Sequence, residues 1–159
     1  MKVIKLNKWF YFNATLFIFA LYKVIYGSHL LVSLIGGLGL LFILFNWTRH
    51  AMFSTIRSNI PRQTKIKYAK LSKRVLPIHK WTGMTAFIII IYHGYLAINL
   101  YGFNLGITKI FSGMFGIIVL TGIVIFGWLR WFKASYIKRI IHLWLGLLLF
   151  FVIIVHVIL

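Results

Sequence analysis

The chain has 159 residues, of which 62% are hydrophobic, and its charged side chains are 18 Lys and Arg with no Asp or Glu. A water-soluble domain has about 25% charged residues, whereas this chain has 11%. The composition therefore excludes a conventional soluble fold and indicates an integral membrane protein. Because carboxylates and cysteine are both missing, carboxylate acid–base pairs, Ser-His-Asp triads, thiolate nucleophiles and disulfides are excluded. Histidine is the residue left for chemistry.

Five apolar segments are long enough to cross the hydrocarbon core as helices, which takes about 20 residues. In chain order they cover 9–27, 30–47, 79–101, 110–129 and 140–159. We expect helices because an open sheet would leave backbone polar groups unsatisfied in lipid. The segment 48–78 is basic and polar, and we expect it to be a cytoplasmic loop. The sequence thus predicts an all-α integral membrane bundle that forms a single domain.

The cationic residues lie almost entirely on one side of the predicted membrane. Sixteen of the 18 share the side of the amino terminus, and only Lys23 and Lys109 lie on the other. Since cytoplasmic loops carry the excess of Lys and Arg, we expect the amino terminus inside and the carboxyl terminus outside. A basic run beside membrane spans favours anionic lipid over nucleic acid as its partner. We therefore expect lipid contacts, no nucleic acid, and a multi-pass location in a bacterial plasma membrane.

Two segments repeat at an offset of 63 residues, each with the pattern H-x-W-x-G followed by a second histidine. The first contains His79 and His93, the second His142 and His156, with 13 residues between the two histidines of each segment. Fourteen helical steps climb about 21 Å and end within about 40° of whole turns, so both histidines of a helix face the same way. The third and fifth helices run in the same direction, which matches His79 with His142 and His93 with His156 in depth.

Facing histidines at two depths indicate a cofactor site between helices of a bundle. Zinc prefers four ligands, and no Cys, Asp or Glu is available to complete the set. A haem brings four nitrogens of its own and needs only two axial imidazoles. Gly83 and Gly146, each four residues after an inner histidine, would leave room for a porphyrin face. The pattern predicts two stacked haems with two histidine ligands each.

Basic residues near the inner histidines are candidate partners for haem propionates, because charge-assisted hydrogen bonds to carboxylates are strong. They are Arg74, Lys80, Lys138 and Arg139. The outer level offers fewer candidates, which are Lys109, Asn99, Asn104 and Tyr101. His29 and His50 lie at the ends of predicted spans, and we interpret both as interfacial residues.

The motifs His79-Lys-Trp-Thr-Gly to Tyr92-His93 and His142-Leu-Trp-Leu-Gly to Val155-His156 stand in the third and fifth spans. They resemble the ferric-reductase-like transmembrane domain, which is shared by ferric reductases, NADPH oxidases and the membrane haem subunit of the bacterial methionine sulfoxide reductase system. The resemblance implies two b-type haems, with His79 and His142 as ligands of the inner haem and His93 and His156 of the outer one. It also implies electron transfer from a cytoplasmic flavin or quinol to an outer acceptor.

Two features depart from that family. Relatives usually have a sixth helix, and many continue into a flavin- and nicotinamide-binding domain. This sequence has no G-x-G-x-x-G motif after a strand, so we expect no flavin or nicotinamide site in the chain. Electrons would come from a separate cytoplasmic flavoprotein or from quinol in the membrane, and a further membrane subunit or a second copy would complete the bundle.

The sequence therefore predicts a dihaem b-type cytochrome that carries electrons across the bilayer, and an oxidoreductase if it reduces the outer acceptor itself. Two alternatives stay open. One is a permease or proton relay in which the four histidines line a hydrated path, which needs further polar residues at intermediate depth. The other is a non-catalytic membrane assembly subunit.

Overall fold

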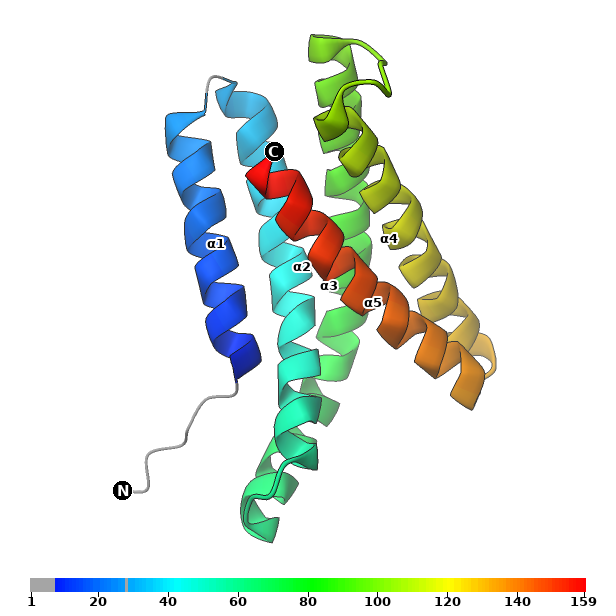
Figure 1. The fold of residues 1–159 in the computed structure, drawn as a ribbon. Coiled ribbons are helices and arrows are strands. Elements are labelled where there is room, and N and C mark those ends of the chain that lie inside the picture. Colours follow the sequence, from blue (N-terminus) through cyan, green and yellow to red (C-terminus); the bar gives the residue numbers. More distant parts are fainter. Residues whose placement is uncertain (1–7, 28) are drawn as a thin grey trace.

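The computed structural model describes residues 8–27 and 29–159, and every regular element in these ranges is an α-helix (Figure 1). The helices are α1 (Lys8–Tyr26), α2 (Leu30–Arg57), α3 (Arg62–Tyr101), α4 (Thr108–Phe132) and α5 (Tyr136–Ile158). All five are long and apolar enough to cross a membrane. The prediction of an all-α bundle with five membrane-spanning helices is confirmed.

The basic segment 48–78, which we predicted to be a loop, is instead a helical hairpin. Helix α2 continues to Arg57, and α3 begins at Arg62. The backbone N–H and the Oγ of Ser58 both donate to the Thr55 carbonyl, at 3.1 and 2.6 Å, and end α2. The prediction was wrong because low hydropathy does not distinguish a solvated helix from a loop, and Lys, Arg and Gln are good helix formers.

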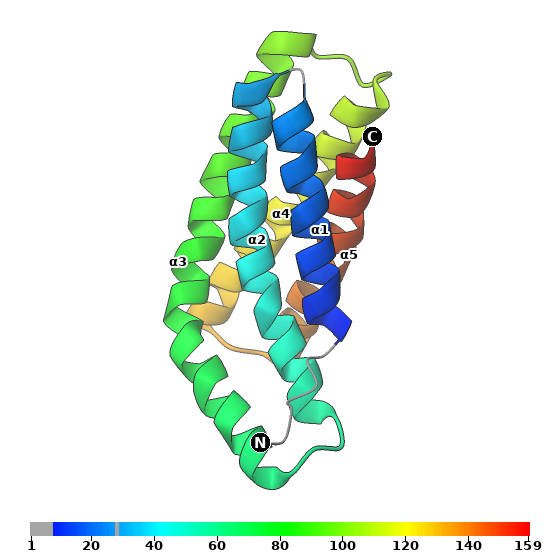
Figure 2. The same ribbon diagram turned by 90° about the vertical axis from the view of Figure 1, so that its left-hand side faces the viewer.

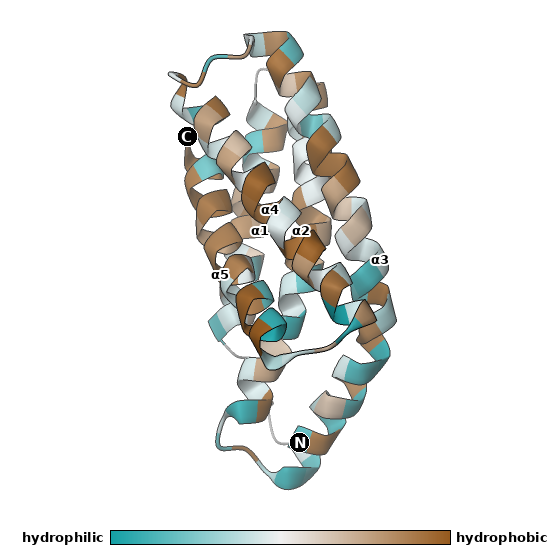
Figure 3. Cartoon of the chain, turned by 90° about the vertical axis from the view of Figure 1, so that its right-hand side faces the viewer, coloured by the Kyte–Doolittle hydropathy of each residue, from teal (hydrophilic) through white to brown (hydrophobic). Residues whose placement is uncertain are grey.

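The hairpin extends beyond the rest of the bundle. Helix α3 has 40 residues, which makes it about 60 Å long and about twice as long as the hydrocarbon core is thick. Figure 2 shows α3 bending where it leaves the bundle toward the hairpin. Pro77 lies inside this helix, and an interior proline removes a backbone hydrogen bond and kinks a helix. The hairpin is also the most hydrophilic end of the molecule in Figure 3.

Helices α3 and α5 lie at opposite edges of the bundle in two opposed views (Figures 2 and 3). Helix α2 packs along α3 and α1, α4 packs along α5 and α3, and α1 contacts α5. Within the described ranges, α3 and α5 are not one of the packed pairs. They face each other with α1 and α2 on one side and α4 on the other, which is the arrangement that positions the histidines.

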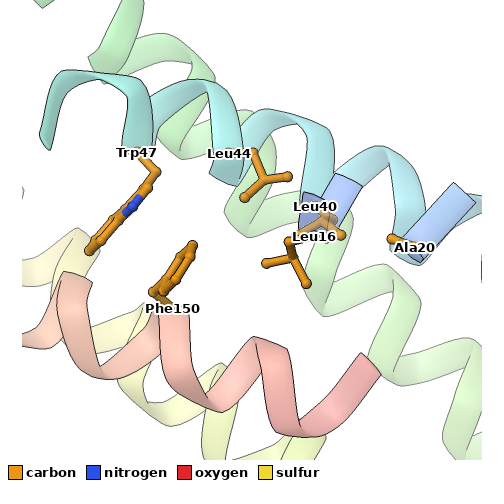
Figure 4. Packing of buried hydrophobic residues seen from close by; sticks show 6 residues of the cluster. All are labelled: Leu16, Ala20, Leu40, Leu44, Trp47 and Phe150. Carbon is orange, nitrogen blue, oxygen red and sulfur yellow. The ribbon is translucent and has the colours of Figure 1, made fainter. Parts of the chain in front are cut away.

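Two clusters of buried side chains join the helices. The first connects α1, α2 and α5 (Figure 4) through Leu16, Ala20, Leu40, Leu44, Trp47 and Phe150. The second connects α4 and α5 through Val119, Leu120 and Leu149, with Ile43, Phe87 and Ile90 packed against it. Many other large apolar side chains are exposed on the outside of the bundle, as expected for helices whose surroundings are lipid.

Candidate functional site

The four repeated histidines form two pairs across the bundle, one from α3 and one from α5 in each pair. The ring centroids of His79 and His142 are 6.3 Å apart, with 79° between the ring planes. The centroids of His93 and His156 are 6.2 Å apart, with 89° between the planes. The structure thus brings together the same partners that the helical spacing predicts.

The ring separations match two imidazoles bound to one metal ion from opposite sides. A metal–nitrogen bond is about 2.0 Å long, and a five-membered ring with bonds of about 1.33 Å places each nitrogen about 1.1 Å from the centroid. Two such rings on one ion have centroids about 6.3 Å apart. Both pairs have this separation. The ring separation of each pair is therefore compatible with two imidazole ligands on one metal ion.

Three of the four histidines use Nδ1 as a hydrogen-bond donor. His93 donates to the Val32 carbonyl and His142 to the Ile123 carbonyl, both at 3.0 Å. A carbonyl only accepts, so each Nδ1 carries the proton and each Nε2 keeps its lone pair. Metal-ligating histidines almost always hold their second nitrogen in this way.

His156 reaches the same state through a side chain. Its Nδ1 lies 2.9 Å from Ser112 Oγ, and that hydroxyl donates its own hydrogen to the Lys109 carbonyl at 3.0 Å. Because the hydroxyl has one hydrogen, it accepts from His156 Nδ1–H. His79 differs, since its Nδ1 is buried with no hydrogen-bond partner among residues 8–27 and 29–159.

Glycines of the flanking helices let three histidine rings lie against helix backbones. A Cβ on Gly36 of α2 would lie 2.8 Å from His93 Cε1. On α4, a Cβ on Gly113 would lie 3.1 Å from His156 Cε1, and one on Gly127 would lie 3.6 Å from His142 Cε1. Sequence reasoning missed these three positions. A signal existed, because Gly113 and Gly127 are separated by the same 13 residues as the histidines they face.

The two glycines predicted to face a porphyrin lie against α2. A Cβ on Gly83 would have Asn46 Nδ2 as its nearest neighbour at 3.6 Å, and a Cβ on Gly146 would have Trp47 Cζ3 at 3.5 Å. Both are ordinary contact distances, so each site has room for a methyl group. Asn46 Oδ1 also accepts a 2.8 Å hydrogen bond from Thr82 Oγ1. The structure thus places both glycines at the level of Asn46 and Trp47.

The basic residues predicted near the inner histidines have varied surroundings. Lys80 Nζ lies over the Trp131 ring, 4.6 Å from its centroid. Lys138 Nζ donates to the carbonyls of Leu129 and Lys133, at 3.3 and 3.1 Å, and so satisfies the end of α4. Arg74 and Arg139 are exposed.

Two arginines that the sequence analysis did not single out contribute to the charge around the inner pair. Arg49 of α2 and Arg130 of α4 are both half-buried and within electrostatic range of His79 and His142. The Nε of Arg49 is buried and unpartnered in the part of the chain that the structure describes. At the outer level, Lys109 is the lysine within range of both His93 and His156. No acidic side chain exists in the chain to neutralise these cations.

A metal held by protein ligands alone has no support in the described ranges, where no group of three or more His, Cys, Asp or Glu side chains gathers. Two histidines suit an ion whose other ligands belong to a macrocycle. Fold and site together describe a multi-pass membrane helical bundle with two stacked pairs of histidines. No family model, no curated protein and no solved structure matches the chain, so a functional conclusion depends on this geometry.

Proposed function

We propose that the chain is a dihaem b-type membrane cytochrome, similar to the ferric-reductase-like transmembrane domain, that carries electrons across the bilayer. His79 and His142 would ligate the inner haem, and His93 and His156 the outer one. The observation that carries the proposal is the pair of nearly equal ring separations, 6.3 and 6.2 Å, within a membrane bundle. A bound haem supplies a reversible one-electron couple whose potential depends on its ligands and surroundings.

The chain would contribute ligands of fixed orientation and a cationic environment. The Val32 and Ile123 carbonyls and the Ser112 hydroxyl hold three imidazoles by their Nδ1 atoms, which raises the basicity of each Nε2. Arg49 and Arg130 would donate hydrogen bonds to the propionates of the inner group, because carboxylates form strong charge-assisted bonds with guanidinium groups. Both arginines are less exposed than Arg74 and Arg139.

The layer between the two histidine levels is apolar, which favours electron transfer over a proton relay. The cluster of Val119, Leu120 and Leu149 is packed by Phe87 and Ile90 of α3. Phe87, Ile90 and Leu149 stand between the histidines of α3 and of α5 in the sequence, and Val119 and Leu120 stand between Gly113 and Gly127 of α4. A proton path needs a continuous chain of hydrogen-bonding groups, whereas electrons cross a dry gap. We therefore favour the cytochrome over the permease.

The direction of transfer follows from charge. The hairpin end carries most of the Lys and Arg residues, so the positive-inside rule places it, with the His79–His142 pair, on the cytoplasmic side. Electrons would enter there from a separate flavoprotein or from quinol and leave near His93 and His156. Anionic lipid would contact the basic hairpin.

The direct test is a pyridine haemochrome assay and an absorption spectrum of the purified protein, with two haems b per chain as the expected result. Alanine variants of His79 and His142 should lose the inner haem and keep outer haem, and those of His93 and His156 should do the reverse. His50→Gln is the matched control, because His50 stacks on Trp47 and belongs to neither pair. A colourless protein after expression with added haem precursor would overturn the proposal.

A further inference from the structure

The two turns at the basic end of the bundle have different chemistry. The turn between α2 and α3, residues 58–61, contains no aromatic side chain. The turn between α4 and α5, residues 133–135, lies among five large aromatic side chains that are all more than half exposed, namely Trp128, Trp131, Phe132, Tyr136 and Trp144. Tryptophan and tyrosine concentrate where a membrane meets water. The α4–α5 turn therefore has the composition of a segment in the headgroup layer, and the α2–α3 turn does not.

The hairpin extends well beyond the α4–α5 turn (Figure 2). Arg62, which begins α3, stands 17 residues before His79, whereas Tyr136, which begins α5, stands six residues before His142. At about 1.5 Å per residue these stretches rise about 25 and 9 Å, so the tip of the hairpin lies up to roughly 16 Å farther out. Charges are screened over about 8 Å at physiological ionic strength. A headgroup at the level of the α4–α5 turn is therefore attracted mainly by the cations of that turn.

Three cations with no anionic partner in the chain lie around this turn. Lys133 and Arg139 stand on either side of it, and both are exposed. Lys80 comes from α3, and its Nζ lies 4.6 Å from the centroid of the Trp131 ring, which joins α3 to the turn. Lys138 differs, because its Nζ already donates to two backbone carbonyls at the end of α4. Since the chain has no Asp or Glu, an anion for the other three must come from outside it.

An anionic phospholipid matches both the cations and the aromatic rings. Each Lys or Arg near an anionic membrane surface contributes about 1 kcal/mol of attraction, so three cations favour an anionic headgroup over a zwitterionic one. A soluble anion would use the cations but would leave the exposed rings of Trp131 and Phe132 in water, and burying apolar surface is favourable by about 25 cal/mol per Å². The combination of charge and exposed rings therefore selects a lipid.

We propose that the α4–α5 turn is a binding site for an anionic phospholipid of the cytoplasmic leaflet. Lys80, Lys133 and Arg139 contact its phosphate, and Trp131 and Phe132 lie beside the upper part of its acyl chains. The site joins α3, α4 and α5 at the end of the bundle that carries the His79–His142 pair. It does not depend on a bound haem, and it assigns the headgroup contact to this turn and not to the tip of the hairpin.

The test uses the full chain in phosphatidylcholine nanodiscs that contain a trace of a photoactivatable lipid. Two probes carry the same diazirine in the upper acyl chain, one with a phosphatidylglycerol and one with a phosphatidylcholine headgroup. Peptides covering 128–144 should be labelled at least roughly fivefold more by the phosphatidylglycerol probe. Lys80→Gln, Lys133→Gln and Arg139→Gln should each lower this ratio by about 2- to 5-fold, because one cation contributes up to about 1 kcal/mol.

The matched controls are Arg62→Gln and Lys65→Gln, which remove the same charge from the tip of the hairpin and should leave the ratio unchanged. Equal labelling by the two probes would overturn the site. An equal loss in the hairpin variants would overturn it too, because the attraction would then belong to the whole basic end. Suppression of the label by millimolar inorganic phosphate would identify a soluble anion as the ligand.

The result is independent of the proposed cytochrome. Haem quantification on the same samples separates the two proposals, because two haems per chain with equal labelling would overturn the lipid site alone. A colourless chain that still prefers the phosphatidylglycerol probe would overturn the cytochrome alone. Lys133 lies in the turn outside the helix interiors, so Lys133→Gln keeps the test decisive if Lys80→Gln does not fold.

Discussion

The inner and outer histidine pairs have almost the same ring separation but different surroundings. At the outer level both imidazoles donate from Nδ1, to the Val32 carbonyl and the Ser112 hydroxyl. At the inner level only His142 has such a partner, and His79 Nδ1 has none in the described ranges. The inner level instead has two arginines within electrostatic range. Hydrogen bonds thus hold both outer imidazoles beside one lysine, whereas the inner level has one held imidazole beside two arginines.

The largest expected effect comes from removing the space beside His93. Gly36→Ala should lower the outer haem content strongly, because the new Cβ would lie 2.8 Å from His93 Cε1. Overpacking of this kind costs about 1–3 kcal/mol, which corresponds to roughly 5- to 150-fold in haem affinity. The measurement is haem content together with the redox titration that separates the two haems.

Gly116→Ala is the matched control, since the nearest atom to its new Cβ would be Val152 Cγ1 at 3.5 Å. We expect it to keep both haems. An unchanged content of outer haem in Gly36→Ala would contradict the contact of the His93 ring with the backbone of α2.

The second prediction concerns how firmly each haem is held. When a ligating histidine loses the hydrogen-bond partner of its second ring nitrogen, affinity for the metal group falls about 10- to 100-fold. The Nδ1 of His79 has no such partner among the residues described. Apomyoglobin added to the purified protein should therefore extract the inner haem at least roughly tenfold faster than the outer. Spectra recorded during extraction would identify which haem leaves first. Equal rates would show that the Nδ1 contacts do not decide retention.

The third prediction concerns the inner potential. Arg49→Gln removes a positive charge near His79 and so stabilises the oxidised haem, which lowers the midpoint potential. At an effective dielectric constant of about 20, the shift should be roughly 50–100 mV. Lys138→Gln is the control, because Lys138 Nζ is bound to the carbonyls of Leu129 and Lys133. If the midpoint potential of the inner haem were unchanged in Arg49→Gln, Arg49 would have no electrostatic effect on that haem.

The smallest expected effect is at Ser112. Ser112→Ala removes the acceptor of His156 Nδ1–H, so the ligand becomes less basic and the outer potential rises. A hydrogen bond of about 1 kcal/mol corresponds to a shift of roughly 40 mV. Ser72→Ala is the matched control, a buried serine of the hairpin whose Oγ has no partner in the described part of the chain. A shift of the inner potential instead would contradict the assignment of His156 to the outer level.

The pairing of the histidines was predictable because it depends only on helix length and direction. The spacing of His79 and His93 sets two heights on one face, and the same spacing recurs for His142 and His156. The hydrogen-bond partners were not predictable, because Val32 and Ile123 act through backbone carbonyls that any residue has. Their roles follow from how α2 and α4 pack beside the ligand helices, which periodicity does not specify.

The cations near the inner histidines were the second feature that the sequence did not predict. The positive-inside argument treated Arg49 and Arg130 as topology signals only, yet they lie within range of the inner histidines. The extent of α2 explains the omission. The predicted span ended at residue 47 and left Arg49 in a loop, whereas the helix continues to Arg57 and fixes the height of Arg49 relative to His79.

The apolar cluster of Val119, Leu120 and Leu149 has a consequence for bioenergetics. Most of the transmembrane voltage would fall across such an apolar layer of low dielectric constant in mid-bundle. Each electron moved through the whole field changes in energy by about 2.3 kcal/mol per 100 mV. The turnover of such a protein would therefore respond to the electrical polarisation of its membrane, while the same layer would keep ions from leaking and preserve that polarisation.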